Sequence, residues 1–154
     1  MTLNTCYMLL FIMFNLFKSN PKSDRPKTLG QLGEEFAQKD YEARGYKIIA
    51  KNEYNKKGLR LGELDFIAVK DKQIVFVEVK TRSLGGSNWF GTAEEAVNQF
   101  KQIKLLKAVK VFLLRNPKYL SFQPQIDVCV VPYNELDKTF KSVKIIVNAV
   151  EDWN

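Results

Sequence analysis

The sequence predicts an α/β fold in a single domain. Two amphipathic helical patterns, near residues 28–44 and 92–114, are separated and followed by short apolar runs of strand length. A chain of 154 residues is long enough for one domain with its own core and too short for two comfortable ones. We therefore expect one folded unit in which helices and strands alternate along the chain.

The N-terminal segment falls outside this pattern. Residues 1–17 carry no charged side chain, yet their apolar run is shorter than the ~20 residues that a membrane-spanning helix needs. The run has no basic stretch before it and no small-residue cleavage site after it, unlike a signal peptide. An interfacial membrane anchor, a secretion signal and an extension from a start codon assigned too early are the alternatives. We favour a non-core extension at residues 1–27, attached to a cytoplasmic domain at 28–154.

The first helix is expected over residues 28–44, with Gly45 as its C-terminal stop. Its apolar stripe consists of residues at helical spacing, namely Leu29, Leu32, Phe36 and Ala43. Glu34 lies beside this stripe, where it either stabilises the helix N-terminus or points towards a sheet edge. Gly30 and Gly33 are poor helix formers, which indicates close approach by another backbone or by phosphate.

Strands are expected at residues 46–52, in a hairpin at 62–82, and at 125–131 and 141–150. The hairpin turn is centred on Asp71 and Lys72, and a two- or four-residue loop there preserves one pairing. A three-residue loop would shift that pairing by one residue.

The hairpin carries three carboxylates and a lysine, and its pairing decides how they meet. With the turn at Asp71 and Lys72, the predicted opposite pairs are Asp65 with Glu78 and Glu63 with Lys80. Opposite side chains have Cβ atoms roughly 5 Å apart, so like charges there are destabilising unless something lies between them. The charged face continues into Ile67, Val69, Ile74 and Phe76, and the other face holds Leu64, Phe66, Val75, Val77 and Val79. Carboxylates between two apolar faces are costly to bury alone, which favours a divalent cation over an ordinary solvated hairpin end.

A long helix is expected after the hairpin. Trp89 and Phe90 lie on the loop before it, where they either stack on unpaired bases or cap the core, the better expectation. A capping box at Thr92 and Glu95 opens the helix, which ends near Leu114. Its buried stripe is predicted to be Ala96, Val97, Phe100, Ile103, Leu106, Val109 and Leu113. Lysines recur every third residue as Lys101, Lys104, Lys107 and Lys110, a ridge that fits either a phosphate backbone or a solvated face.

The composition limits the chemistry. The chain has no histidine, which excludes Ser-His-Asp and Cys-His machinery and histidine-bearing metal sites. Cys6 and Cys129 cannot form a four-cysteine zinc site, and their apolar surroundings indicate buried thiols in a reducing compartment. The 24 Lys and Arg residues against 17 Asp and Glu give a net charge of +7, which is typical of nucleic-acid-binding domains.

Asp65, Glu78 and Lys80 suit phosphodiester hydrolysis. This reaction needs a nucleophilic water and neutralised phosphate oxygens, which one or two Mg²⁺ ions held by carboxylates provide. A nearby lysine ammonium can hold the water or stabilise developing charge. We therefore expect Mg²⁺, or Mn²⁺ in its place, at the two carboxylates.

The order of these motifs resembles a known superfamily. Gly62-Glu63-Leu64-Asp65 followed by Glu78-Val79-Lys80 is similar to the restriction-endonuclease-like PD-(D/E)XK pattern, with Leu64 in place of its proline. More closely, the chain resembles the uncharacterised YraN-like family, which is related to archaeal Holliday-junction resolvases. The matching blocks are Gly33-Glu34 with Ala37, Gly45-Tyr46, Asn52, Gly62 to Asp65, Phe76 to Arg82, Ala96-Val97 with Lys101, and Ile126-Asp127-Val128.

The resemblance implies a restriction-endonuclease-like core in the order αβββαβ, with a central mixed sheet flanked by helices. It also implies a set of site residues: Asp65 and Glu78 as metal ligands, Lys80 as a catalytic group and Glu34 as an accessory acid. We add Arg82, Lys101 and Lys104 as candidate nucleic-acid contacts, and Glu63 in a supporting role.

The leading hypothesis is a Mg²⁺-dependent endonuclease acting on DNA, such as branched or repair intermediates. The alternative is a non-catalytic nucleic-acid-binding protein that keeps the nuclease fold. A third hypothesis, a membrane-associated protein, predicts that removal of residues 1–27 abolishes function. Branched DNA often calls for a two-fold partner, so a homodimer is compatible with the first hypothesis, although no sequence pattern demands one.

Overall fold

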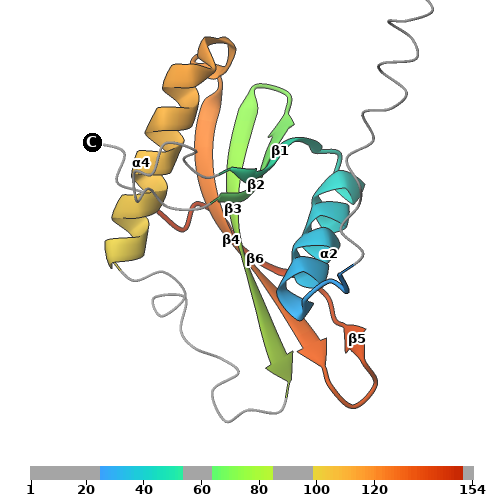
Figure 1. Ribbon diagram of the computed structural model, residues 1–154. Helices are drawn as coiled ribbons and strands as arrows, with labels where there is room; N and C mark the ends of the chain where they lie inside the picture. The colour runs from blue at the N-terminus through green and yellow to red at the C-terminus, as the bar shows by residue number, and fades with distance from the viewer. Residues whose placement is uncertain (1–24, 54–63, 85–98, 151–154) are drawn as a thin grey trace, which may run out of the picture.

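The computed structural model describes residues 25–53, 64–84 and 99–150. Its elements are α2 (Leu29–Ala43), β1 (Lys47–Glu53), β2 (Leu64–Lys70), β3 (Gln73–Leu84), α4 (Gln99–Arg115), the 3₁₀ helix η1 (Pro117–Tyr119), β4 (Gln123–Asn134), β5 (Thr139–Phe140) and β6 (Lys144–Ile146). One sheet has the strand order β1-β2-β3-β4-β5, and β6 also pairs with β4 (Figure 1). The predicted α/β class and the order αβββαβ are confirmed.

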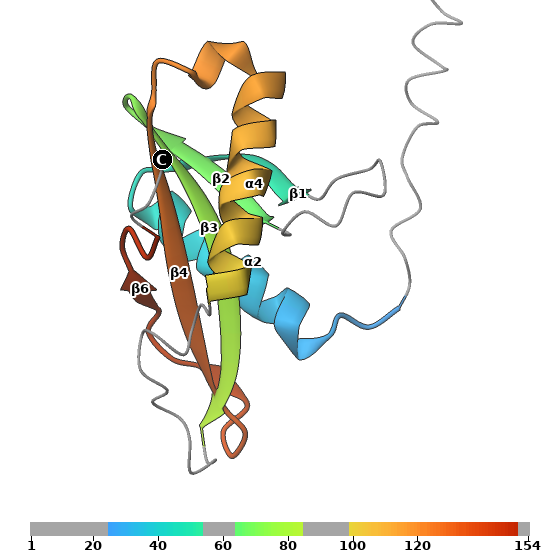
Figure 2. The same cartoon turned by 90° about the vertical axis from the view of Figure 1, so that its left-hand side faces the viewer.

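The sheet is mixed. β1 pairs with β2, and β2 with β3, in antiparallel ladders, whereas β3 and β4 pair in parallel along their full lengths. Parallel neighbours need a crossover connection, and α4 lies in it. Figure 1 shows α4 on one face of the sheet and α2 on the other, and Figure 2 views the sheet from the α4 side. β3 is therefore a central strand with a helix on each of its faces.

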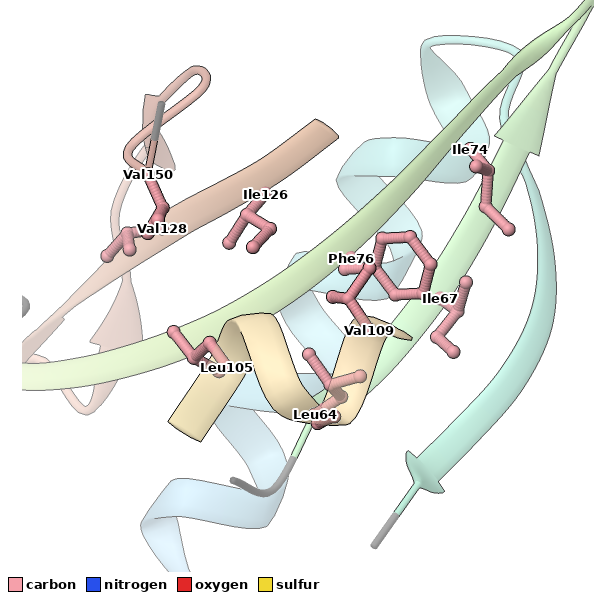
Figure 3. Close-up of a cluster of buried hydrophobic side chains, with 10 residues drawn as sticks. Leu64, Ile67, Ile74, Phe76, Leu105, Val109, Ile126, Val128 and Val150 are labelled. Atoms are coloured by element: carbon pink, nitrogen blue, oxygen red, sulfur yellow. The ribbon is translucent and has the colours of Figure 1, made fainter. Parts of the chain in front are cut away.

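Two hydrophobic clusters fill the layers between the sheet and the helices. The cluster beneath α4 includes Leu64, Ile67, Ile74, Phe76, Leu105, Ala108, Val109, Ile126, Val128 and Val150 (Figure 3). The cluster beneath α2 consists of Ala37, Tyr41, Phe66, Ala68, Val75, Val77, Cys129 and Val131. The expected buried thiol is confirmed for Cys129, whose pKa is raised to about 12, mainly by burial.

The predicted hairpin register is confirmed near the turn, but the predicted pair of Asp65 with Glu78 lies beyond the last ladder pair, and Glu63 lies outside the described residues. The turn contains two residues, and Asp71 adopts a φ of 53° there. The ladder pairs run from Lys70 with Gln73 to Phe66 with Val77, in the predicted register. The predicted alternation of faces was wrong for Leu64, which packs beneath α4; it lies beyond the last pair with β3 and is paired only with Glu53 of β1.

α2 has the predicted ends, but its buried face matches the predicted stripe only in part. Thr28 is its N-cap, and Gly45 follows the C-cap with a φ of 87°, a left-handed conformation that glycine adopts without strain. The stripe is confirmed for Phe36, which packs against the cluster beneath α2, and wrong for Leu32, which is 40% exposed. The buried residues are Gly33, Ala37, Gln38 and Tyr41.

Gly33 explains why this face is chosen. A Cβ atom at Gly33 would lie 2.0 Å from Oγ1 and 3.1 Å from Cβ of Thr81. Only glycine therefore allows α2 to lie this close to β3. The close approach that the sequence indicates is to a strand side chain at Gly33, whereas a Cβ at Gly30 would make only an ordinary contact of 3.9 Å with Thr28.

Replacing Gly33 by alanine is expected to destabilise the fold by about 1–3 kcal/mol, because the added methyl group forces α2 away from Thr81. Urea unfolding measures this change. Gly30→Ala is the matched control in the same helix, and it should be neutral or stabilising because alanine is the better helix former. Equal effects of the two substitutions would contradict the packing argument.

The last predicted strand, residues 141–150, was wrong in length. Only Lys144–Ile146 is a strand, and Asn148 has a φ of 52°. Its backbone N–H donates to Oδ1 of Asp127 at 3.0 Å, and the N–H of Ala149 donates to the carbonyl oxygen of Ile126 at 2.8 Å. The buried carboxylate of Asp127 thus binds the backbone directly after the strand, and the strand ends there.

No helix among the described residues is long and apolar enough to span a membrane. The apolar leader at residues 1–17 lies outside the described residues.

Candidate functional site

β2 and β3 part at Asp65, and this separation builds the site. The last ladder pair is Phe66 with Val77. Beyond it, Oδ2 of Asp65 accepts the backbone N–H of Val79 at 2.6 Å, so a side chain replaces a strand-to-strand hydrogen bond. The Asp65 carboxylate is therefore held against β3 between Glu78 and Lys80.

Glu78 is the most buried charged residue of the candidate site, with only 6% of its surface exposed. Its Oε1 atom accepts a hydrogen bond from Nζ of Lys80 at 2.8 Å, and Nζ of Lys101 contacts the same oxygen. Lys80 comes from the same strand and Lys101 from α4. A buried carboxylate needs such partners, because an unpaired charge in this position would be strongly destabilising.

The two lysines respond differently to this shared oxygen. For Lys80, burial alone would lower the pKa, but the hydrogen bond to Glu78 and the nearby Asp65 carboxylate outweigh it, and the pKa is raised. For Lys101, burial and the adjacent Lys80 ammonium outweigh the attraction of Glu78, and the pKa is lowered. Lys80 is therefore a firmly held cation at neutral pH, suited to stabilising negative charge rather than accepting a proton.

The helical phase of α4 explains why Lys101 reaches the sheet. Leu105, Val109 and Phe112 contribute to the core, and Lys101 precedes Leu105 by four residues, so it lies on the same face. The predicted stripe is confirmed for Leu106, Val109 and Leu113 and wrong for Ile103, which is 51% exposed; Ala96 and Val97 lie outside the described residues. The four-lysine ridge therefore starts on the buried face and drifts to the exposed positions Lys104, Lys107 and Lys110.

The remaining predicted residues are more scattered. Glu34 is half-buried next to the contact between Gly33 and Thr81, the residue after Lys80. Arg82 and Lys104 are exposed. Several predictions lie outside the described residues: Glu63, the loop aromatics Trp89 and Phe90, and the capping box at Thr92 and Glu95.

The donor set fits a hard cation such as Mg²⁺. Asp65 and Glu78 supply carboxylate oxygens, and Mg²⁺ is often held by one or two carboxylates together with waters and substrate phosphate. No group of three acidic or cysteine side chains that could hold a metal occurs among the described residues, so Glu34 does not complete a protein-only cage with this pair. Asp65 and Glu78 would hold the ion.

Sequence reasoning missed a second polar network, beneath α2. Asp127 is 3% exposed. Its Oδ2 accepts the hydroxyl of Tyr41 at 2.8 Å, and its Oδ1 accepts the amide of Gln125 at 2.6 Å in addition to the backbone N–H of Asn148. Burial and the adjacent carboxylate raise the pKa of Tyr41. The only sequence signal was a polar residue inside an apolar strand, and its role here is to anchor α2 and the C-terminal segment to β4.

Comparison with known proteins yields one family. The model of the uncharacterised protein family UPF0102 matches residues 33–131. A UPF0102 protein of Caldanaerobacter subterraneus subsp. tengcongensis is 39% identical over 128 residues, covering 83% of this chain and 98% of that protein. A UPF0102 protein of Syntrophomonas wolfei is 40% identical over 123 residues, covering 80% of this chain and 97% of that protein. A UPF0102 protein of Clostridium botulinum strain Kyoto is 36% identical over 125 residues, covering 81% of this chain and 95% of that protein. These descriptions state no activity.

Proposed function

The chain belongs to the UPF0102 family, and from the site that it carries we propose that it is a metal-dependent nuclease of the PD-(D/E)XK type, acting on DNA. The observation that carries the proposal is the convergence of Asp65, Glu78 and Lys80 at the point where β2 and β3 part. This convergence adds geometry to the motif resemblance, and the αβββαβ order of the elements agrees with it.

Each of the three side chains has a distinct role in this proposal. When bound, Mg²⁺ would neutralise phosphate oxygens and supply an activated water. Asp65 and Glu78 would hold that ion, and the backbone N–H of Val79 donates to Oδ2 of Asp65 and fixes this carboxylate in place. Lys80, protonated because its pKa is raised, stabilises negative charge that develops on the phosphate.

The surroundings of the site support a polyanionic substrate. Arg82 lies two residues after Lys80 on the same strand and is exposed, and Lys104 is exposed one helical turn beyond Lys101. Cations arranged around a phosphodiester-cleaving site bind the nucleic-acid backbone without reading its sequence. The net charge of +7 adds a long-range attraction for DNA.

A cleavage assay tests this function. Supercoiled plasmid and a four-way DNA junction are incubated with the full chain in Mg²⁺ or Mn²⁺, and we expect strand scission that stops when EDTA is added. The control is the double variant Asp65→Asn with Glu78→Gln, purified identically, which should not cut. Cutting by this variant would assign the activity to a contaminant and contradict the proposal.

One observation favours a second function, that of a non-catalytic nucleic-acid-binding protein. Glu78 already has two ammonium partners, and Asp65 accepts a backbone N–H, so the protein itself stabilises both carboxylates. In that case the chain would bind DNA with a strong salt dependence but leave it intact in every metal tested. The same assay, with a gel-shift measurement beside it, separates the two functions.

A further inference from the structure

We propose that Lys101 is a displaceable counterion of Glu78, which α4 supplies and which competes with the divalent cation for that carboxylate. The inference rests on the proposed function and concerns how the same site is regulated. Lys101 was expected from its sequence position to contact nucleic acid, but its Nζ contacts Oε1 of Glu78.

The geometry carries this inference in two ways. First, Lys80 and Lys101 both contact the oxygen Oε1, so one carboxylate is shared by two ammonium groups. A divalent cation that binds Glu78 adds two more positive charges at the same carboxylate, and it repels both ammonium groups. This repulsion favours the withdrawal of one of them.

Second, Lys101 is the partner that can leave. Its side chain is 34% exposed, against 22% for Lys80 and 8% for Glu78. It reaches Glu78 from a separate element, whereas Lys80 lies two residues away on the same strand. The long, flexible stem of Lys101 can swing towards solvent or towards the phosphate backbone without any change in the sheet.

The consequence is a cation site whose affinity depends on α4. While Lys101 contacts Glu78, ammonium groups alone balance the charge of the carboxylate. A cation competes with the Lys101 ammonium for this carboxylate, and a phosphate group that attracts Lys101 would ease the exchange. The site would then load metal most readily when substrate is present.

Metal binding without DNA tests the inference independently of catalysis. Free Mn²⁺ is measured by electron paramagnetic resonance during titration of the full chain. Lys101→Gln should bind Mn²⁺ about fivefold more tightly than wild type, because a partly exposed ion pair that opposes binding is removed. Lys101→Arg keeps the charge and the contact, and it should restore an affinity close to that of wild type.

Lys110→Gln is the matched control, since it removes the same charge from the same helix at an exposed position outside the candidate site. It should change the affinity by less than about twofold. If Lys101→Gln binds no more tightly than Lys110→Gln, the counterion role is wrong while the nuclease proposal stands. If wild type binds no Mn²⁺, or binds it equally well after Asp65→Asn, both the counterion role and the nuclease proposal are wrong. Thermal unfolding of each variant confirms that the fold is kept.

Discussion

Lys80→Met is expected to slow DNA cleavage by about 10²–10³-fold at saturating Mg²⁺, the usual cost of losing one charged group that stabilises a transition state. Methionine keeps the apolar stem of the lysine and removes only the ammonium group. The pKa of Lys80 is raised, so this group is a cation at neutral pH, and its loss cannot be compensated by a change of buffer pH. Initial rates of plasmid nicking measure the effect.

Two further variants identify the cause of that loss. Lys80→Arg keeps a positive charge and should recover part of the rate. Lys39→Met removes an exposed lysine from α2, on the opposite face of the sheet, and should leave the rate within about twofold. A purely structural role for Lys80 would instead show as a lower unfolding temperature with an unchanged rate for the folded fraction. In that event Lys80 would not be catalytic.

The hairpin could be predicted from sequence because its information is local. Strand side chains alternate with period two, and the turn at Asp71 and Lys72 joins neighbouring strands, so one residue of loop length decides the register. The predicted pair of Asp65 with Glu78 assumed that the register continues for one more step. What the register could not reveal is that the ladder ends at Phe66 and that a carboxylate takes over the next backbone N–H.

The helices were harder because their buried face depends on what they pack against. In α2 the apolar spacing included the exposed Leu32 and missed Gly33, whose contact with Thr81 brings this face against β3. In α4 the predicted stripe included the exposed Ile103 and missed the buried Leu105, which follows Lys101 by four residues. Without Leu105 in the buried stripe, Lys101 was assigned to the surface ridge.

Ammonium partners also changed the interpretation of the buried acids. Two carboxylates facing each other in a hairpin predicted a metal between them, since the local sequence offered only Lys80 as a counterion. The structure brings a second ammonium group to Glu78, that of Lys101 on α4, which follows Lys80 by 21 residues in the sequence. Non-local ion pairs of this kind leave no periodic signal, and they show why the metal at this site stays a prediction to be measured.

Asp127→Ala is expected to lower the free energy of unfolding by about 3–5 kcal/mol, a large part of the roughly 5–15 kcal/mol that holds a typical domain. The substitution leaves three donors without their acceptor inside the protein: the Tyr41 hydroxyl, the Gln125 amide and the Asn148 backbone N–H. Each belongs to a different segment, so the loss loosens α2 and the C-terminal segment together. Urea unfolding followed by circular dichroism measures it.

Graded variants show whether hydrogen bonding is the cause. Asp127→Asn keeps one acceptor oxygen and should cost about 1–2 kcal/mol, and Tyr41→Phe should cost a similar amount because it leaves the other two donors satisfied. Glu135→Ala, which removes an exposed carboxylate from the turn between β4 and β5, should change the midpoint little. Since Gly33 and Glu34 lie on the helix that Tyr41 anchors, the Asp127 variants should also weaken cleavage by the folded fraction, but much less than Lys80→Met does. A full loss of cleavage in a stably folded Asp127→Asn protein would contradict a purely anchoring role.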